Sequence, residues 1–510
     1  SGLVCVHEAC RALQAGDCSM AIAGGISVGG GAGGGDDEES TDALGAVLAG
    51  DSTVRPFDKK SAGTVFGEGC AALLLKPLSK AVADGDYIHG IITASATNND
   101  GASNGITAPN PVAQTDVICK AWESAGIDPR KISYVETHGT GTLLGDPIEF
   151  KALNNAFRKY TDKKQFCGIG SAKSNVGHLI AASGCVGLMK VILSMQHRTL
   201  PASLNFEEPN PHIDFLDSSL YLVDHTSPWG SEDETLYAGV SSFGFSGTNV
   251  HVVLESAEKY QPKKKTAESR PRILTISAKT EWSLKQIVKN YSDFVDSNPD
   301  LDLDAFCATA LLGRGHYNFR VAVAFTDYGD LKNKLNHMNW SGYNNAYDDV
   351  YYGSYKVVSD RRTDRSEGEY SESEVRETNR LADETLSKIT AGDGSFEDYK
   401  QLCIYYIRGA SISWRKLFKD NIPHKLPIPT YSFERTLYWA EPKVMKAGGV
   451  GIEGEENGHP LVERCLLKSI NQDIYTTRFS VKKHWVLHDH VIMGRNILPG
   501  TAYVEIAREA

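Results

Sequence analysis

The chain has 510 residues, of which 41% are hydrophobic and 23% are charged, and its 53 basic and 64 acidic side chains leave a net charge of −11. This length predicts about three domains, and the acidic balance argues against a nucleic-acid-binding protein, which usually presents a basic stripe. No apolar run approaches the ~18 residues that a membrane-spanning helix needs. The ten cysteines show no paired CxxC spacing, so we interpret them as reduced thiols of a cytoplasmic protein.

Both ends of the chain predict helices without boundary signals. Ser1-Gly2-Leu3 runs straight into a helical pattern that continues to Leu13, with no initiator Met, signal peptide or N-cap. Residues 501–510 form another helical pattern with no Gly or Pro to stop it. Helices usually begin at a capping side chain and end at such a residue, so we expect a piece of a longer protein.

Residues 1–256 alternate short apolar runs with helical patterns. Strands are expected at 20–25, 71–75, 88–94 and 132–136, and helices at 113–125, 147–157 and 184–196. This alternation predicts a layered α/β domain. It is the first of three predicted domains.

The second predicted domain spans residues 257–445 and the third spans 446–510. In the second, residues 273–325 predict a small β-α-β unit, 360–394 a charged helix with exposed or mobile ends, and the proline-rich run 426–434 an extended segment laid across another domain's surface. In the third, 446–458 is a glycine-rich linker, and a new fold begins at His459.

Two short motif matches lack the context that their chemistry requires. Residues 29–34 fit G-x-G-x-x-G, but four acidic residues follow and no helix opens there, so we predict a surface loop rather than a dinucleotide site. Ser103 fits G-x-S-x-G, but prolines follow where a nucleophile elbow needs a helix. Neither match supports a function.

Two histidines stand in glycine-rich turns. His138 follows the predicted strand 132–136 within Thr-His-Gly-Thr-Gly-Thr, and His178 precedes the predicted helix 184–196 within Ser-Asn-Val-Gly-His. Glycines let a substrate approach the backbone closely. Each histidine alone is more often a structural residue, but two imidazole N–H groups converging on one point would stabilise an enolate oxygen. We therefore predict that the two rings meet in one buried thioester pocket.

A third glycine-broken turn spans residues 239–249 and precedes a strand at 250–254. Gly and Ser collect in ordinary turns, and alone this segment would be interpreted as one. The alternative is a functional turn whose backbone N–H groups form an oxyanion hole.

The three turns, in this order and spacing, resemble the β-ketoacyl synthase family, specifically the ketosynthases of modular type I polyketide synthases. Five further segments match that family: 55–58 (Arg-Pro-Phe-Asp), 67–69 (Gly-Glu-Gly), 98–101 (Asn-Asn-Asp-Gly), 145–149 (Gly-Asp-Pro-Ile-Glu) and 208–211 (Glu-Pro-Asn-Pro). The resemblance covers residues 1–256. It implies the thiolase-like α-β-α-β-α fold, usually as a homodimer, with no metal and no directly bound cofactor.

The resemblance also implies a role for each matching position. His138 and His178 correspond to the family's catalytic histidines, and Lys173 corresponds to its catalytic-site lysine. Among the substrate-binding matches, Glu149 corresponds to the charge partner of Lys173. Thr140 and Thr142 correspond to residues that contact the phosphopantetheine arm of an acyl carrier protein. The backbone N–H of Phe245 corresponds to a donor of the oxyanion hole, with Ser246 replacing the commoner Gly.

The family's nucleophilic cysteine is expected two residues before Ser1, because its Cys-Ser-Ser-Ser/Gly-Leu-Val pattern aligns with Ser1-Gly2-Leu3-Val4. Cys5 lies on the following helix and is interpreted as a packing residue. In the intact protein the resemblance implies that the cysteine accepts an acyl chain, that the two histidines assist decarboxylation of a malonyl thioester, and that the resulting carbanion attacks the acyl thioester. We expect this polypeptide alone to have no condensing or dehydrating activity.

Residues 257–445 resemble the flanking subdomain that follows a polyketide ketosynthase, through segments 274–279, 313–316, 407–414 and 426–439. The missing Gly-His-Ser-x-Gly acyltransferase signature resembles synthases that are loaded by a trans-acting acyltransferase. Residues 459–510 resemble the start of a hot-dog-fold dehydratase with an H-x-x-x-G-x-x-x-x-P motif. His490 would be its general base, which removes the α-proton of a β-hydroxyacyl thioester.

Two other functions remain open at this stage. A fatty-acid synthase of the animal type would use the same chemistry, although the missing acyltransferase argues against it. A non-catalytic scaffold would keep the fold only to dimerise and to dock carrier proteins.

Overall fold

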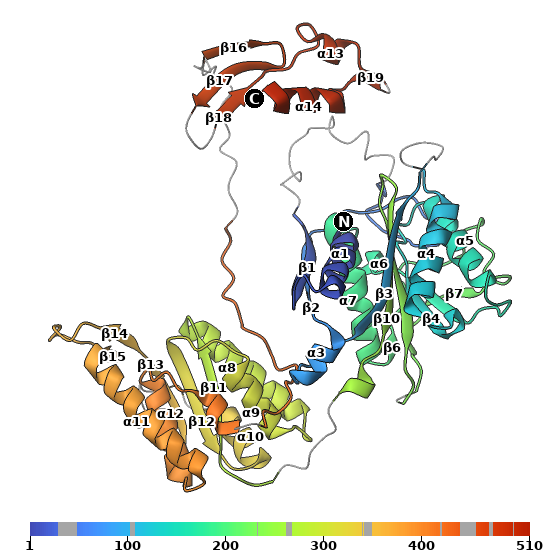
Figure 1. The fold of residues 1–510 in the computed structure, drawn as a ribbon. Coiled ribbons are helices and arrows are strands. Elements are labelled where there is room, and N and C mark those ends of the chain that lie inside the picture. The colour runs from blue at the N-terminus through green and yellow to red at the C-terminus, as the bar shows by residue number, and fades with distance from the viewer. Residues whose placement is uncertain are drawn as a thin grey trace. The chain divides into compact units, whose positions relative to one another are not determined.

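The computed structural model describes residues 1–28, 48–101, 108–231, 233–261, 268–338, 340, 349–418, 421–438, 455–468, 473–492 and 494–509. The motif matches at 29–34 and at Ser103 lie outside these residues. The chain divides into two compact units, Ser1–Glu434 and Arg435–Ala510 (Figure 1). Within the described ranges, no helix is both long enough and apolar enough to span a bilayer.

A six-stranded mixed sheet with strand order β3-β10-β9-β4-β5-β7 forms the centre of the first unit's N-terminal part. Its strands are β3 (Ile91–Asn99), β4 (Ile132–Glu136), β5 (Cys167–Gly170), β7 (Leu220–Leu222), β9 (Tyr237–Phe243) and β10 (Thr248–Glu255). Strands β9, β4, β5 and β7 are mutually parallel, whereas β10 is antiparallel to both neighbours. The run Asn249–Glu255 of β10 is entirely buried, as expected for a strand covered on both faces.

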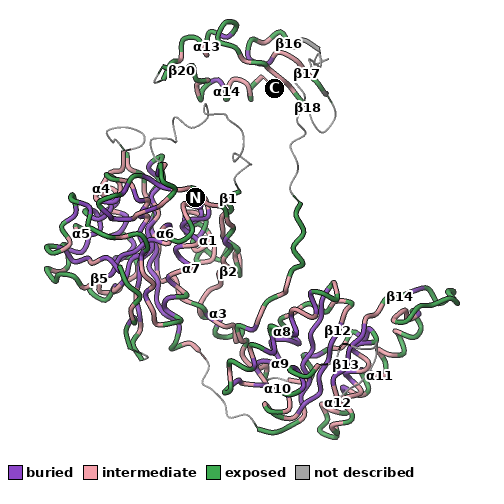
Figure 2. The backbone as a smooth tube through the Cα atoms, turned by 180° about the vertical axis from the view of Figure 1, so that it is seen from behind, coloured by how far each residue is buried: buried purple, intermediate pink, exposed green. Residues whose placement is uncertain are grey.

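Helices cover both faces of this sheet, and a second sheet lies beyond one helical layer (Figure 1). Helices α4 (Pro111–Ala125) and α5 (Gly145–Arg158) pack on one face, and α1 (Gly2–Ala15) and α7 (Ser183–Gln196) pack on the other. The antiparallel pair β1 (Ala21–Ser27) and β2 (Gly69–Leu75) packs on the outer side of α1 and α7. These elements form four consecutive layers, α-β-α-β, with apolar cores between them (Figure 2).

Local sequence signals explain why the helices begin and end where they do. The Asn110 side chain accepts hydrogen bonds from the amides of Val112 and Ala113 at the start of α4, and Gly126 ends that helix in the left-handed conformation. The remaining short elements of this part are α3 (Leu78–Ala83), α6 (Lys173–Val176), β6 (Thr199–Leu200), β8 (Ser227–Pro228), and the 3₁₀ turns η2 (Pro129–Lys131), η3 (Ile180–Ala182) and η4 (Glu258–Tyr260).

The flanking part of the first unit is built on a three-stranded antiparallel sheet, β11-β12-β13. Its elements are β11 (Arg272–Ala278), α8 (Glu281–Ser297), α9 (Leu303–Leu312), β12 (Phe319–Phe325), α10 (Tyr328–Asn336), β13 (Val350–Ser354), β14 (Lys356–Val358), β15 (Glu369–Ser371), α11 (Glu372–Ala391), α12 (Phe396–Ile407) and η5 (Trp414–Phe418). The predicted β-α-β unit was wrong. Two helices, α8 and α9, separate β11 from β12 instead of one. The chain returns to the same end of the sheet at which β11 ended, so β11 and β12 pair antiparallel rather than parallel.

The proline-rich run 426–434 is extended and lies on the flanking part itself. The Leu426 amide donates to the Thr309 hydroxyl at 2.9 Å, and the Arg314 guanidinium donates to the Ile428 carbonyl at 2.8 Å. Farther along, the Tyr431 hydroxyl accepts the amide of Lys279 at 3.0 Å. Hydrogen bonds from surrounding side chains and loops therefore replace the sheet ladder that proline excludes.

The second unit contains a three-stranded antiparallel sheet and two helices. Its elements are β16 (Glu455–His459), β17 (Val462–Lys468), β18 (Asp473–Thr476), α13 (Trp485–His488), β19 (Val491–Ile492), β20 (Arg495–Asn496) and α14 (Gly500–Glu509). The predicted linker 446–458 is too long at its C-terminal end, because residues from Glu455 onward pair with β17. Leu461, Val486 and Ala502 form a small core.

Candidate active site

The site forms where three neighbouring parallel strands end. Strands β9, β4 and β5 are adjacent and parallel, so their carboxyl ends meet at one edge of the sheet. The turn after β4 carries His138, the loop after β5 carries Lys173 and His178, and the hairpin turn after β9 follows Phe243. Ligands commonly bind at such carboxyl edges. The topology therefore explains why turns far apart in the sequence converge.

The structure brings the two predicted histidine rings together. Their centroids lie 5.5 Å apart and the ring planes are nearly perpendicular, at 84°. Phe243 packs 6.1 Å from the His138 ring, and Phe66 packs 6.0 Å from the His178 ring. The sequence analysis predicted neither aromatic neighbour. It considered only the glycines of the segments around Phe66 and Phe243 and assigned no role to the aromatic side chains.

The ring of His178 is held at its Nδ1 atom by two donors. The backbone N–H of Ile180 points at Nδ1 from 3.0 Å, and the Ser183 hydroxyl lies 2.9 Å from the same atom. A nitrogen that accepts an N–H bond carries no proton, so the proton of the neutral ring is on Nε2. The His178 backbone is also fixed, because its amide donates to the Val65 carbonyl at 2.6 Å and its carbonyl accepts the Gly67 amide at 3.1 Å.

The turn of His138 is held through its backbone. The Glu149 carboxylate accepts the amides of His138 and Gly139 at 2.7 and 2.8 Å, and the Lys173 ammonium donates to the His138 carbonyl at 2.5 Å. The Nδ1 atom of His138 is buried without a hydrogen-bond partner among the described residues. Its Nε2 is therefore the nitrogen left to face a ligand.

Both imidazoles are kept neutral by their surroundings. Burial, reinforced by the positive charge of Lys173, holds the pKa of His138 well below its usual range. Burial and the same ammonium lower the pKa of His178 to about 3. The amino end of Ser1 also contributes to lowering both pKa values, which places the start of α1 close to the two rings. At neutral pH the pair thus offers N–H donors without a positive charge.

Three buried carboxylates surround Lys173. Burial lowers the pKa of the Lys173 ammonium, and the negative charges of Glu136, Glu149 and Asp146 oppose that shift, with Glu136 the strongest of the three. Glu149 itself is 4% exposed and uses its oxygens on backbone amides, so its contact with Lys173 is a Coulomb interaction. Glu149 therefore supports the His138 turn through its two backbone hydrogen bonds and acts on Lys173 through its charge.

Two of the segments that carry the family resemblance, 55–58 and 145–149, hold the loop that contains Thr140 and Thr142. The two threonine hydroxyls lie 3.3 Å apart. Behind them, the buried Asp146 carboxylate accepts the amides of Gly141 at 3.2 Å and of Phe57 at 2.7 Å, and burial raises its pKa to about 7. These hydrogen bonds join the 55–58 and 145–149 segments, which the sequence alone could not place in contact.

Phe245 lies in the hairpin turn between β9 and β10, and its side chain is 60% exposed. The turn is closed by the amides of Gly244 and Gly247, which leaves the Phe245 amide outside both bonds. Asp100 holds the turn from outside, because its amide donates to the Gly247 carbonyl at 2.8 Å and its carboxylate accepts from buried Asn249 at 2.7 Å. The strand β9 extends to Phe243, so the turn is shorter than the predicted span 239–249.

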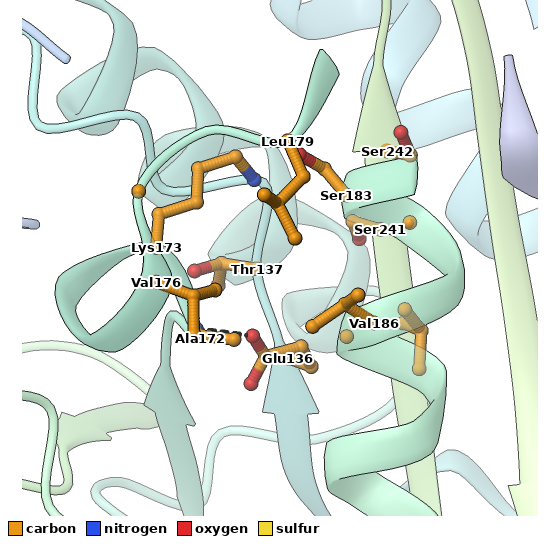
Figure 3. Close-up of a pocket in the computed structure, with 14 residues that line it drawn as sticks. Glu136, Thr137, Ala172, Lys173, Val176, Leu179, Ser183, Val186, Ser241 and Ser242 are labelled. Carbon is orange, nitrogen blue, oxygen red and sulfur yellow. Dashed lines mark hydrogen bonds between the residues drawn. The ribbon is translucent and has the colours of Figure 1, made fainter. Parts of the chain in front are cut away.

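A small cavity lies between the end of β4, the segment that carries Lys173 and the start of α7 (Figure 3). Lys173, Ser183, Ser241 and Glu136 contribute polar groups to its wall, and Leu179 and Val186 contribute apolar ones. The Glu136 carboxylate accepts the Ala172 amide at 2.6 Å and pairs with Lys190 at 2.8 Å. Among the described residues no group of three or more His, Cys, Asp or Glu is arranged to hold a metal ion.

His490 lies in the second unit, between α13 and β19. Its Nδ1 is 2.7 Å from the Ile497 carbonyl and must donate to it, which leaves Nε2 as the unprotonated nitrogen of the neutral ring. Gly494 of the same motif adopts a φ of 79°, in the left-handed region that glycine tolerates. His484 is buried beside Phe479 and contacts the Ser480 backbone, as a structural histidine would.

Four family profiles match consecutive segments of the chain. They are the beta-ketoacyl synthase N-terminal domain at residues 1–81, the beta-ketoacyl synthase C-terminal domain at 89–207, the ketoacyl-synthetase C-terminal extension at 209–321 and the polyketide synthase dehydratase domain at 459–510. The solved ketosynthase from module 6 of the bacillaene synthase from Bacillus subtilis 168 is 35% identical, with a TM-score of 0.73, over 86% of this chain and 73% of that one. This chain belongs to the ketosynthase family of polyketide synthases.

The thiolase-like ketosynthase fold expected from the sequence is confirmed, as is the dehydratase-like segment at the end. The polyketide synthases PksN and PksM of Bacillus subtilis (strain 168) are 35% and 36% identical to this ketosynthase over its full length. The ketosynthase chain spans only 9% of PksN and 12% of PksM.

Proposed function

We propose that this ketosynthase, within its parent synthase, joins an acyl group to a malonyl-derived unit by decarboxylative condensation, which makes it an acyltransferase. The supporting observation is the perpendicular pair of neutral imidazoles, 5.5 Å apart at the carboxyl edge of the sheet. A developing enolate oxygen is stabilised by N–H donors that are already in place and need no reorganisation. A histidine pair that served only the fold would not need both rings, each of intermediate burial, at the same edge of the sheet.

In the proposed reaction, the C–C bond to the malonyl carboxylate breaks, CO₂ leaves, and the electron pair forms a thioester enolate. The Nε2–H groups of His178 and His138 donate hydrogen bonds to the enolate oxygen. The enolate carbon then attacks the acyl thioester carbonyl, and the nucleophile's sulfur leaves as a thiolate. The product is a β-ketoacyl thioester, and no external oxidant or reductant is required.

We place the nucleophile two residues before Ser1. Helix α1 begins beside the site, because a Cβ on Gly2 would meet the Ala181 carbonyl at 2.4 Å, three residues after His178. The amino end of Ser1 is close enough to lower the pKa of both histidines. A cysteine at a helix N-terminus has a lowered pKa and so is a stronger nucleophile at neutral pH. On this basis the 510-residue chain alone has no condensing activity.

The remaining site residues have positioning and binding roles in this proposal. Lys173 and Glu149 hold the His138 turn from behind, and the amide of Phe245 donates to the acyl thioester oxygen. Thr140 and Thr142 hydrogen-bond the phosphopantetheine arm of the acyl carrier protein, which brings both substrates.

His490 acts in the next step of the proposed sequence, dehydration of the β-hydroxyacyl thioester. Its Nε2 lone pair is directed away from the Ile497 carbonyl and is free to remove the α-proton. The acid that would protonate the leaving hydroxyl is expected beyond residue 510, so the chain alone does not dehydrate.

We further propose the division 1–256 ketosynthase, 257–445 flanking subdomain and 446–510 linker and dehydratase start. The parent synthase is expected to be a cytoplasmic homodimer that receives malonyl units from a trans-acting acyltransferase. The absent acyltransferase signature between ketosynthase and dehydratase segments supports this loading mode.

The decisive experiment uses the parent synthase segment that includes the residues upstream of Ser1, with malonyl- and acyl-loaded carrier proteins. CO₂ release and a β-ketoacyl carrier product are expected, and both should fall in His138→Ala and His178→Ala. His225→Ala is the matched control, since His225 is exposed and pairs only with its neighbour Asp224. CO₂ release without a C–C bond, or neither product, would overturn the condensing role and favour a scaffold.

A further inference from the structure

Ser183 is the first residue of α7, and no role follows for it from the resemblance. It is 9% exposed, and its hydroxyl lies 2.9 Å from Nδ1 of His178. The same nitrogen already accepts the backbone N–H of Ile180 at 3.0 Å. An atom that accepts an N–H bond cannot also donate, so the Ser183 hydroxyl must be the donor in its own bond.

The Ile180 amide reaches Nδ1 only through an unfavourable backbone conformation. Ile180 adopts a φ of 43°, and β-branched residues rarely occupy that region. Strained residues of this kind persist where surrounding contacts over-determine them, and they cluster at functional sites. Its side chain is 56% exposed, so packing of the isoleucine does not account for the strain.

The two donors come from different elements, which restricts the ring more than either would alone. The Ile180 amide belongs to η3, and the Ser183 hydroxyl belongs to the start of α7. Rotating the ring by half a turn would place a C–H group against both donors. Moving the proton from Nε2 to Nδ1 would break the hydrogen bond from the Ile180 amide and would force the Ser183 hydroxyl to turn and accept instead of donate.

We propose that Ser183 is a positioning residue that, together with the Ile180 amide, holds the tautomer and the rotation of His178, so that Nε2–H faces the thioester pocket. The inference deepens the proposed function and rests on it for its kinetic consequence, but the tautomer itself is measurable without catalysis. Ser183 does not touch the reacting atoms. It acts through Nδ1, on the far side of the ring from the ligand.

Another charge that faces the ring also opposes its protonation. The Lys173 ammonium on α6 lowers the pKa of His178, after burial. The His138 ring, after β4, is the remaining titratable neighbour. Removal of the Ser183 hydroxyl leaves all of these in place, so a change in the titration of His178 would report the hydroxyl alone.

The test uses the parent ketosynthase with Ser183→Ala, with Ser183→Thr to restore the hydroxyl, and with Ser194→Ala as a matched control. Ser194 is buried on the same helix, farther from the site. Histidine ¹⁵N NMR spectra should show an unprotonated Nδ1 for His178 from pH 5 to 8 in the wild type, Ser183→Thr and Ser194→Ala. In Ser183→Ala a second tautomer or a protonated form should appear.

The rate of malonyl decarboxylation should fall about 3- to 10-fold in Ser183→Ala, the range expected for one lost hydrogen bond. The acid limb of its pH profile should move up by about one pH unit, since weaker hold on Nδ1 favours protonation. Ser183→Cys, which keeps the volume with a weak donor, replaces Ser183→Ala if that variant does not fold.

An unchanged tautomer and pH profile in Ser183→Ala would overturn the inference, as would a lower melting temperature with an unchanged pH profile, which marks a structural role only. If the wild type does not decarboxylate malonyl thioesters, the proposed function fails. The NMR result would still decide whether Ser183 fixes the ring.

Discussion

The two histidine turns reach the same point by opposite means. His178 is fixed through its ring, with two donors on Nδ1, whereas His138 is fixed through its backbone, by Glu149 and Lys173. Nδ1 of His138 has no hydrogen-bond partner in the described chain. The comparison teaches that the contacts of its ring define the tautomer of His178, whereas no hydrogen bond among the described residues orients Nδ1 of His138.

The largest expected effect comes from removing the ring that is already oriented. His178→Ala should lower malonyl decarboxylation by about 10²- to 10³-fold, the usual loss for one preorganised oxyanion donor. His138→Ala should cost less, because no hydrogen bond at Nδ1 presets the tautomer that presents an N–H from His138. Release of labelled CO₂ from malonyl-carrier protein measures the rate of each variant. Equal losses in His178→Ala and His138→Ala would contradict the difference between the two rings.

Removing the backbone support of the His138 turn should have the next largest effect. Lys173→Met loses the charged donor to the His138 carbonyl, and a hydrogen bond to a charged group is worth about 10- to 100-fold in rate when it is lost. Lys173→Arg is the comparison variant, since it keeps the charge. In Lys173→Met the pKa of His178 should rise, because the ammonium that helps to lower it is lost, while Nδ1 of His178 stays unprotonated at neutral pH. A second tautomer of His178 in the histidine NMR spectra would show that the two turns are not independent.

Glu149→Gln should have a smaller effect. Its side-chain amide offers one acceptor where the carboxylate served two backbone amides, so one of the bonds to His138 and Gly139 is lost and the rate should fall about tenfold or less. Glu149→Asp should not restore the rate, because its shorter side chain does not reach both amides. The rate is measured by steady-state decarboxylation. An unchanged near-UV circular dichroism spectrum would show that the variant is folded and that the loss of rate is not caused by unfolding.

The smallest expected effect is on stability at acid pH. Burial lowers the pKa of His178 to about 3, below its unfolded value near 6.5, so the folded state binds fewer protons between these values. Stability from this group is complete above pH 6.5 and is lost as the pH falls. Between pH 6.5 and 5.5 the wild type should lose about 1 kcal/mol more than His178→Gln, measured by urea unfolding. Equal losses would mean that His178 is solvated.

The sequence predicted those elements whose signals are local. Strand β4 has the predicted bounds, and α7 begins one residue before its predicted start, because continuous apolar runs and helical periodicity are read from neighbours in the chain. The β11–β12 pairing was mispredicted because strand direction depends on where the intervening helices return the chain, which no local pattern records. The site shows the same division. His138 and His178 are marked by their glycines, whereas the roles of Ser183, Asp100 and Phe243 depend on distances across the fold.

The charge state of the paired rings bears on which substrates the pocket can accept. In the proposed reaction, an imidazolium at either ring would attract the malonyl carboxylate and stabilise its negative charge. It would thereby oppose the loss of that group as neutral CO₂. It would also disfavour the uncharged acyl chain of the proposed reaction. In the proposed reaction, therefore, neither the malonyl carboxylate nor the acyl chain meets an imidazolium in the pocket.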